Sequence, residues 1–104
     1  MNKMDDSVYL TKKLSQEELN NEFLDACDRG HYKVVTDLYD KFHYNFKRAQ
    51  AIYTDEYRKK QWGVNYDIYL TKETIKKGVS LSLKNNHKRS IRFWRKENWI
   101  GINK

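Results

Sequence analysis

The chain has 104 residues and a formal net charge of +7, and a chain of this length folds as one domain, here residues 1–104. It has one cysteine, no apolar run of about 18 residues and no signal-peptide core near its start, so we expect a cytoplasmic protein without disulfides, secretion or membrane insertion. Proline is absent and glycine occurs only 4 times, which favours helices, and 8 Tyr, 4 Phe and 3 Trp residues supply area for a core.

The first half of the chain predicts a helical hairpin. Residues 1–14 show no helical periodicity and are expected to form a flexible or edge arm. A capping box that begins at Ser15 marks the start of a helix, and Gly30 supplies the left-handed residue at its end. A second amphipathic helix follows at about 31–42, so we expect the hairpin to span about 15–42.

The middle of the chain predicts two different elements. Apolar residues recur at helical spacing from Asn45 to Gln61, which indicates a central helix that stops before Gly63. Residues 64–70 instead alternate between apolar and polar types, which is typical of a short half-buried strand or an extended connector.

The C-terminal third admits two interpretations. Residues 79–83 alternate as a strand would, and Asn85-Asn86 is a suitable turn, so an α+β fold with a C-terminal β-hairpin is the alternative. A helical interpretation follows if the segment is related to the first hairpin. The two interpretations differ for residues 79–95, and an internal repeat discriminates between them.

Sliding the chain along itself until Ser15 falls on Thr71 aligns the first hairpin with a second one, without a gap. Gly30 then falls on Asn86, and every core position of the first hairpin meets an apolar or small residue. We therefore predict a mainly α fold in which two related hairpins, about 15–42 and 71–97, lie around the central helix.

Residues 26–38 resemble the inner part of an ankyrin repeat, in which a small residue precedes Gly-His and a Val-Val pair precedes Leu. Residues 82–94 are similar to a degenerate copy of the same string, so the resemblance covers about half of the chain. It implies a small stack of helical hairpins that serves as a protein-binding surface, with no catalysis and no cofactor.

Few residues have a spacing that indicates chemistry. Cys27 occupies a position in the core stripe, which predicts a buried, inert thiol, and His31 and His87 each follow a helix-ending residue, which predicts a structural role in a turn. No Cys-x-x-Cys, His-Glu-x-x-His or glycine-rich phosphate loop occurs. We therefore expect no enzyme, no metal site and no cofactor.

The basic C-terminal segment is the candidate partner-binding site. At about 100° per residue, its cations fall within an arc of roughly 120° on the last helix, and two aromatic residues lie beside them. A charged face that merely keeps the protein in solution is the alternative. The predicted partner-binding residues are Lys88, Arg89, Arg92, Phe93, Arg95, Lys96 and Trp99.

Charge polarity supports binding to something acidic. Residues 1–41 carry 6 Lys and Arg against 9 Asp and Glu, whereas residues 42–104 carry 15 against 5. We expect a protein-binding module that docks on an acidic surface of a host factor, in the manner of a phage or viral inhibitor of a defence protein. Low-specificity binding of RNA or DNA is the second hypothesis. Head-to-tail dimerisation is compatible with the polarity, but the sequence leaves the oligomeric state open.

A group of tyrosines in the middle of the chain has two possible uses. Some of them are needed in the core, and any that remain exposed favour a protein interface, because tyrosine supplies contact area at a low cost in conformational entropy. The group comprises Tyr53, Tyr57, Tyr66 and Tyr69.

Overall fold

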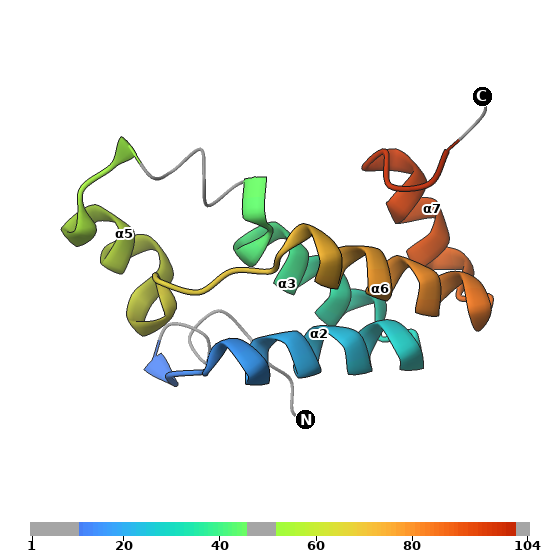
Figure 1. Cartoon of the computed structure of the whole chain (residues 1–104), viewed down its shortest axis with the longest axis horizontal. Helices are drawn as coiled ribbons and strands as arrows, with labels where there is room; N and C mark the ends of the chain where they lie inside the picture. Colours follow the sequence, from blue (N-terminus) through green and yellow to red (C-terminus); the bar gives the residue numbers. More distant parts are fainter. Residues whose placement is uncertain (1–10, 46–51, 102–104) are drawn as a thin grey trace.

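A computed structural model describes residues 11–45 and 52–101. This part of the chain is mainly α-helical, as predicted, and it contains no strand, so the alternative with a C-terminal β-hairpin is wrong. Figure 1 shows the arrangement of the helices. They are α2 (Gln16–Arg29), α3 (Tyr32–Phe42), α5 (Asp55–Trp62), the 3-10 helix η2 (Gly63–Asn65), α6 (Lys72–Lys84) and α7 (Lys88–Lys96).

The two predicted hairpins are formed by α2 with α3 and by α6 with α7, and they begin alike. Ser15 caps α2 at φ −78° and ψ 164°, and Thr71 caps α6 at φ −77° and ψ 164°. Each hydroxyl accepts a hydrogen bond from the backbone N–H three residues later. In the first hairpin the Glu18 carboxylate also accepts from the Ser15 N–H, which completes the predicted capping box.

The turns inside the two hairpins also match. Gly30 has φ 74° and Asn86 has φ 56°, so the aligned residues share the left-handed conformation. The next residue in each turn donates its N–H to the preceding helix: His31 to Ala26 O at 2.9 Å and His87 to Ser82 O at 3.0 Å. The caps and turns that align in the sequence therefore adopt the same backbone conformation in both hairpins.

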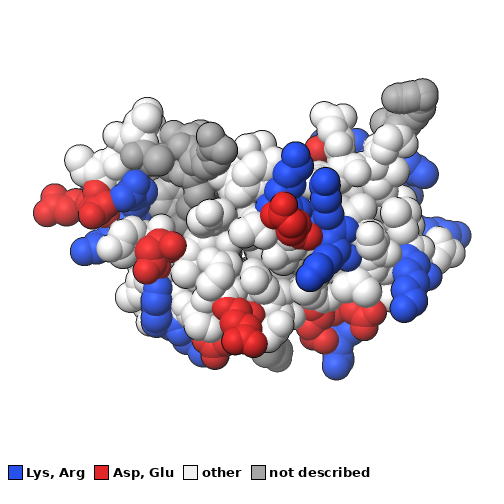
Figure 2. All heavy atoms as spheres, viewed as in Figure 1, with Lys and Arg blue, Asp and Glu red and all other residues white. Residues whose placement is uncertain are grey.

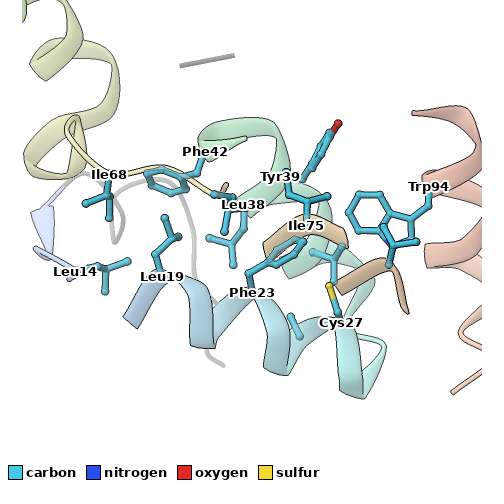
Figure 3. Close-up of a cluster of buried hydrophobic side chains, with 14 residues drawn as sticks. Leu14, Leu19, Phe23, Cys27, Leu38, Tyr39, Phe42, Ile68, Ile75 and Trp94 are labelled. Atoms are coloured by element: carbon cyan, nitrogen blue, oxygen red, sulfur yellow. The ribbon is translucent and has the colours of Figure 1, made fainter. Parts of the chain in front are cut away.

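The hairpins stack through α2 and α6. Figure 1 shows these helices side by side and running in the same direction, with α3 behind them and α7 beyond the end of α6. Figure 3 shows the core between them, where Phe23, Ile75 and Leu38 point toward one another and Trp94 closes the end nearest α7. Leu19 and its repeat equivalent Ile75 are both fully buried, so the repeat extends to the packing.

Gly78 permits this close approach of α2 and α6. A Cβ atom at this position would lie 2.6 Å from a ring carbon of Phe23 and 2.7 Å from Cys27 Sγ. The buried Ser82, one turn later, donates its hydroxyl to Gly78 O and accepts from Trp94 Nε1, both at 3.1 Å. This serine ties α7 to α6 at the surface that α2 covers.

The predicted central helix, Asn45 to Gln61, is confirmed in its last part, where α5 covers Asp55–Trp62 and the Thr54 hydroxyl accepts from the Tyr57 N–H. Asn45 is also helical, residues 52–54 are not α-helical, and residues 46–51 lie outside the described residues. Figure 1 shows α5 at one end of the molecule, whereas the two hairpins pack directly on each other. The predicted central place of this helix is therefore wrong for α5.

Residues 64–70 do not form the predicted strand, and the alternative, an extended connector, holds only for their C-terminal end. The first residues of this segment belong to η2 and a turn, and only the end is extended, where Leu70 N–H donates to Phe42 O at 2.7 Å and forms an isolated bridge beside His43. Val64 is exposed while its polar neighbour Asn65 is completely buried, so the expected alternation does not hold at this end.

The buried Asn65 side chain supplies hydrogen-bond partners for backbone groups of residues 12 and 14. Its Oδ1 accepts from Leu14 N–H and its Nδ2 donates to Lys12 O, each at 2.8 Å. The part of the predicted arm that is described, residues 11–14, is thereby fixed at this point, and Leu14 is buried in the core. Residues 1–10 of that predicted arm lie outside the described residues.

Burial makes Cys27 an unreactive thiol, as predicted. Its side chain is fully buried in the core, and this desolvation raises its pKa from 9.0 to about 12, against a smaller opposite effect of a hydrogen bond with Ser82. In both hairpins the histidine after the turn occupies the N-cap position of the following helix, without a capping hydrogen bond from its side chain.

Replacing Gly78 with alanine should destabilise the protein. Alanine improves helix propensity by about 1 kcal/mol, but the overlap with Phe23 and Cys27 should outweigh it and lower the free energy of unfolding by about 1 to 3 kcal/mol. Urea denaturation measures the change. Ser80→Ala, at an exposed site on α6, is the control and should stay within about 0.5 kcal/mol. A more stable Gly78→Ala variant would contradict the close packing.

The protein should lose stability as the pH rises above about 9. The unfolded thiol of Cys27 ionises there while the folded thiol stays protonated until about pH 12, so the unfolded state is favoured progressively across this window. The loss should be on the order of 1 kcal/mol per pH unit. Unfolding curves between pH 8 and 11 for the wild type and for Cys27→Ala measure it, because the variant lacks this contribution. If the free energy of unfolding falls equally with pH in both proteins, the Cys27 thiol is hydrated and the prediction is wrong.

Candidate partner-binding surface

The cations of α7 form one exposed stripe, as predicted. We call Lys88, Arg89, Arg92, Arg95 and Lys96 the basic stripe, and all five are exposed. The opposite side of α7 is buried through Ser90 and Trp94, which fixes the direction in which the stripe points. Figure 2 shows Lys and Arg side chains over the end of the molecule where α7 lies.

The charges of the basic stripe are not neutralised by neighbouring acids. Within residues 11–45 and 52–101, ion pairs join Lys13 to Asp67, Arg29 to Asp25, Lys33 to Asp37 and Arg58 to Asp55, and none involves a cation of α7. The α7 helix itself contains no acidic residue. Five like charges on a nine-residue helix therefore project a positive potential into the solvent.

A hollow of about 280 Å³ lies at the centre of this surface. It is lined by Tyr32 of α3 and by Arg89, Arg92, Phe93 and Lys96 of α7, so four predicted binding residues converge there. The Arg89 guanidinium lies 4.5 Å from the centre of the Tyr32 ring, a cation–π contact. The hollow combines three cations with aromatic walls.

The aromatic wall of the hollow is held from behind. The Phe93 ring meets Tyr32 edge to face at 6.3 Å and Tyr39 at 5.4 Å between ring centres. Trp99, predicted as a binding residue, is half-buried and donates its Nε1–H to the Tyr39 hydroxyl at 2.8 Å. Trp99 therefore supports Tyr39, which in turn contacts Phe93, and it presents less free surface than predicted.

Three titratable groups lie at the end of α3 near this wall. Burial raises the pKa of Tyr39 and of Asp40, and Glu97 adds to both shifts, whereas burial lowers the pKa of His43 against an opposing effect of Asp40. The His43 ring stacks on Tyr39 at 4.6 Å. These shifts follow from packing, and among the described residues no three His, Cys, Asp or Glu side chains are close enough to hold a metal ion.

A second exposed patch lies around α5. Tyr53, Tyr57 and Tyr69 of the predicted tyrosine group are 41%, 40% and 42% exposed, and the first two rings lie 4.5 Å apart. Tyr66 is half-buried beneath the Lys59 ammonium, 5.3 Å from its ring centre. The exposed tyrosines are the kind of surface that favours a protein partner.

Tyr32 is the residue of this surface that the sequence did not reveal. It directly follows the turn of the first hairpin, far from Arg89 along the chain, and no local pattern links the two. The internal repeat could have indicated the contact. It aligns the start of α7 with the start of α3, so stacking of the two hairpins brings these two helix starts close together.

The longest helix that the structure describes, α2, has 14 residues, and none of the described helices has the length and apolar character that a bilayer crossing needs. Comparisons of the chain with protein-family models, with curated proteins and with solved structures found no match.

Proposed function

We propose that the chain is a non-enzymatic binding module that docks through the basic stripe on an acidic surface of another protein. The observation that supports this is the set of five exposed cations on α7 without acidic partners in the described chain, three of which line a hollow with aromatic walls. An acidic partner would supply the missing counter-charges and would be drawn to this surface over several ångströms.

The chemistry of the hollow suits carboxylates. Arg89 and Arg92 present planar guanidinium groups, which bind carboxylates through two parallel hydrogen bonds, and Lys96 adds a third charge. Phe93 and Tyr32 supply rigid contact area beside them. Arginine next to aromatic rings is the combination enriched among residues that dominate protein interfaces. The resemblance to ankyrin repeats implies the same use.

Nucleic acid is the second candidate partner, because the cation–π pair of Arg89 and Tyr32 and the length of the stripe would also suit a phosphate backbone. The exposed tyrosines around α5 favour the protein partner instead, since they lie in a part of the molecule remote from the stripe and add a second contact area.

Charge reversal of the stripe should abolish binding without unfolding the protein. Arg92→Glu with Arg95→Glu changes two exposed residues, so the circular dichroism spectrum and melting temperature should stay nearly unchanged. Proteins captured from a host lysate by the wild-type chain at about 150 mM salt should be lost from the double variant.

The matched control for this experiment reverses two exposed cations elsewhere. Lys12→Glu with Lys77→Glu has the same change in net charge but lies outside α7 and α5, and it should capture the same proteins as the wild type. If both double variants lose the captured proteins equally, net charge alone explains binding and the docking surface is wrong.

The two candidate partners differ in a direct titration. With a protein partner as the physiological one, labelled single-stranded and duplex oligonucleotides should bind more weakly than about 1 μM at about 150 mM salt. Tighter binding, with log affinity falling at a slope of about −4.5 against log salt for duplex DNA, would correspond to five phosphate contacts and would make nucleic acid the ligand of the stripe.

A further inference from the structure

The two helices in the contact between the hairpins use different faces. We call the face of α2 that contacts α6 its receiving side. On α2, Phe23 and Cys27 receive Gly78 of α6, and Gln16 holds the segment before α6 by donating from Nε2 to Tyr69 O at 2.6 Å. At the other end of α2, the backbone oxygen of Asp28 accepts a hydrogen bond from Asn85 at 3.2 Å, and His87 Nε2 lies 2.6 Å from it. The receiving side of α2 therefore runs along the whole helix.

Because the two hairpins align position by position, α6 has a side that corresponds to the one on which α2 receives α6. Val79, which aligns with Phe23, is buried there, whereas the positions toward both ends of this side are exposed. Leu83 aligns with Cys27, yet it is 48% exposed where Cys27 is fully buried. Lys72 aligns with Gln16, and Lys84 aligns with Asp28. We call Lys72, Lys76, Leu83 and Lys84 the basic edge of α6, and all four are exposed.

The outer side of α2 has the opposite charge. Gly78 is the residue through which α6 packs on α2. Its equivalent in the first hairpin is Glu22, which therefore lies on the outer side of α2. Glu18 and Asp25 lie one turn before and after it on the same helix face. We call these three residues the acidic edge of α2. Arg29, one turn further on, pairs with Asp25 at 3.0 Å, so the uncompensated charges of this edge are those of Glu18 and Glu22. Figure 2 shows Asp and Glu side chains with some Lys and Arg along the lower margin of the molecule, where α2 runs, and Lys and Arg side chains with an acidic group among them over α6 above it.

We propose that copies of this chain associate head to tail, with the basic edge of one copy on the acidic edge of the next. The contact repeats the stacking of α6 on α2 within one chain, and the charges of the two edges are complementary. Outer faces of stacked repeats are ordinarily polar, but here the two faces carry opposite signs. Because the two outer faces have opposite charges, we infer that a second copy of the chain covers the surface around the exposed Leu83.

The association is weaker than the stacking within the chain. Glu22 stands where Gly78 permits close approach, so its side chain keeps the two copies farther apart than α2 and α6. The contact is then led by exposed charges, which salt screens over about 8 Å at physiological ionic strength. Because the two edges are different surfaces, the contact leaves one edge of each kind free, and copies add in a row.

Sedimentation velocity of the full chain tests this directly. At about 20 mM salt the sedimentation coefficient should rise with protein concentration, and at about 500 mM salt it should remain that of a monomer. A monomer at all concentrations up to about 1 mM in low salt, which means a dissociation constant above about 1 mM, would overturn the proposal.

Charge-reversal variants locate the contact. Lys72→Glu with Lys76→Glu should be monomeric in low salt, and so should Glu22→Lys with Asp25→Lys, because each variant has two edges of the same sign. Mixing the two variants should restore association, since it pairs the reversed edges with each other. Two monomeric variants that stay monomeric when mixed would contradict the pairing of these edges.

Two further variants separate this contact from the proposed docking function. Lys59→Glu with Lys60→Glu has the same charge change on α5 and should associate as the wild type does. Arg92→Glu with Arg95→Glu should also associate normally, because the basic stripe of α7 is not part of the contact. If reversal of the stripe abolishes self-association, then α7 provides the contact, and the edges of α2 and α6 do not.

Discussion

The close approach of α2 and α6 is the constraint on which the rest of the fold depends. Gly78 leaves room for Phe23 and Cys27, and Ser82 connects the same stretch of α6 to Trp94 of α7. Because Gly78 and Ser82 are both small, the same surface of α6 can contact α2 and α7. Helices this close form a core that a chain with 38% apolar residues can fill, because little interior volume remains between them. The two hairpins therefore have similar backbones, but their side chains differ at the positions where the hairpins contact each other.

The basic stripe depends on this arrangement for its orientation. Trp94 is buried on the side of α7 that faces the core, and this places the cations on the opposite side. Tyr39 supports the aromatic wall from α3, in contact with Phe93, Trp94 and Trp99. The exposed charges are thus carried by a helix that several aromatic contacts hold in place, which is the condition for a well-defined binding surface.

Much of the fold was predictable because its signals are local or repeated. Ser15, Gly30 and the internal repeat identified both hairpins, and helical geometry alone placed the cations of α7 on one face. Helical spacing also predicted the residues of α5 up to Gln61. The stretch from Gly63 to Leu70 was not predictable in the same way, since the long-range bonds of Asn65 decide its structure. Tyr32 was missed for a related reason: it joins the candidate site only when the hairpins stack.

The contact of Arg89 with Tyr32 would couple the proposed partner binding to the packing of one hairpin on the other. The arginine comes from the second hairpin and the tyrosine from the first, so the hollow exists only while the two are docked. Resting on the ring, the guanidinium has already lost part of its rotamer freedom before a ligand arrives, which reduces the entropy lost on binding. A ligand held by both residues also favours the docked state by mass action. The partner would thus act as a clamp across the two halves of the molecule.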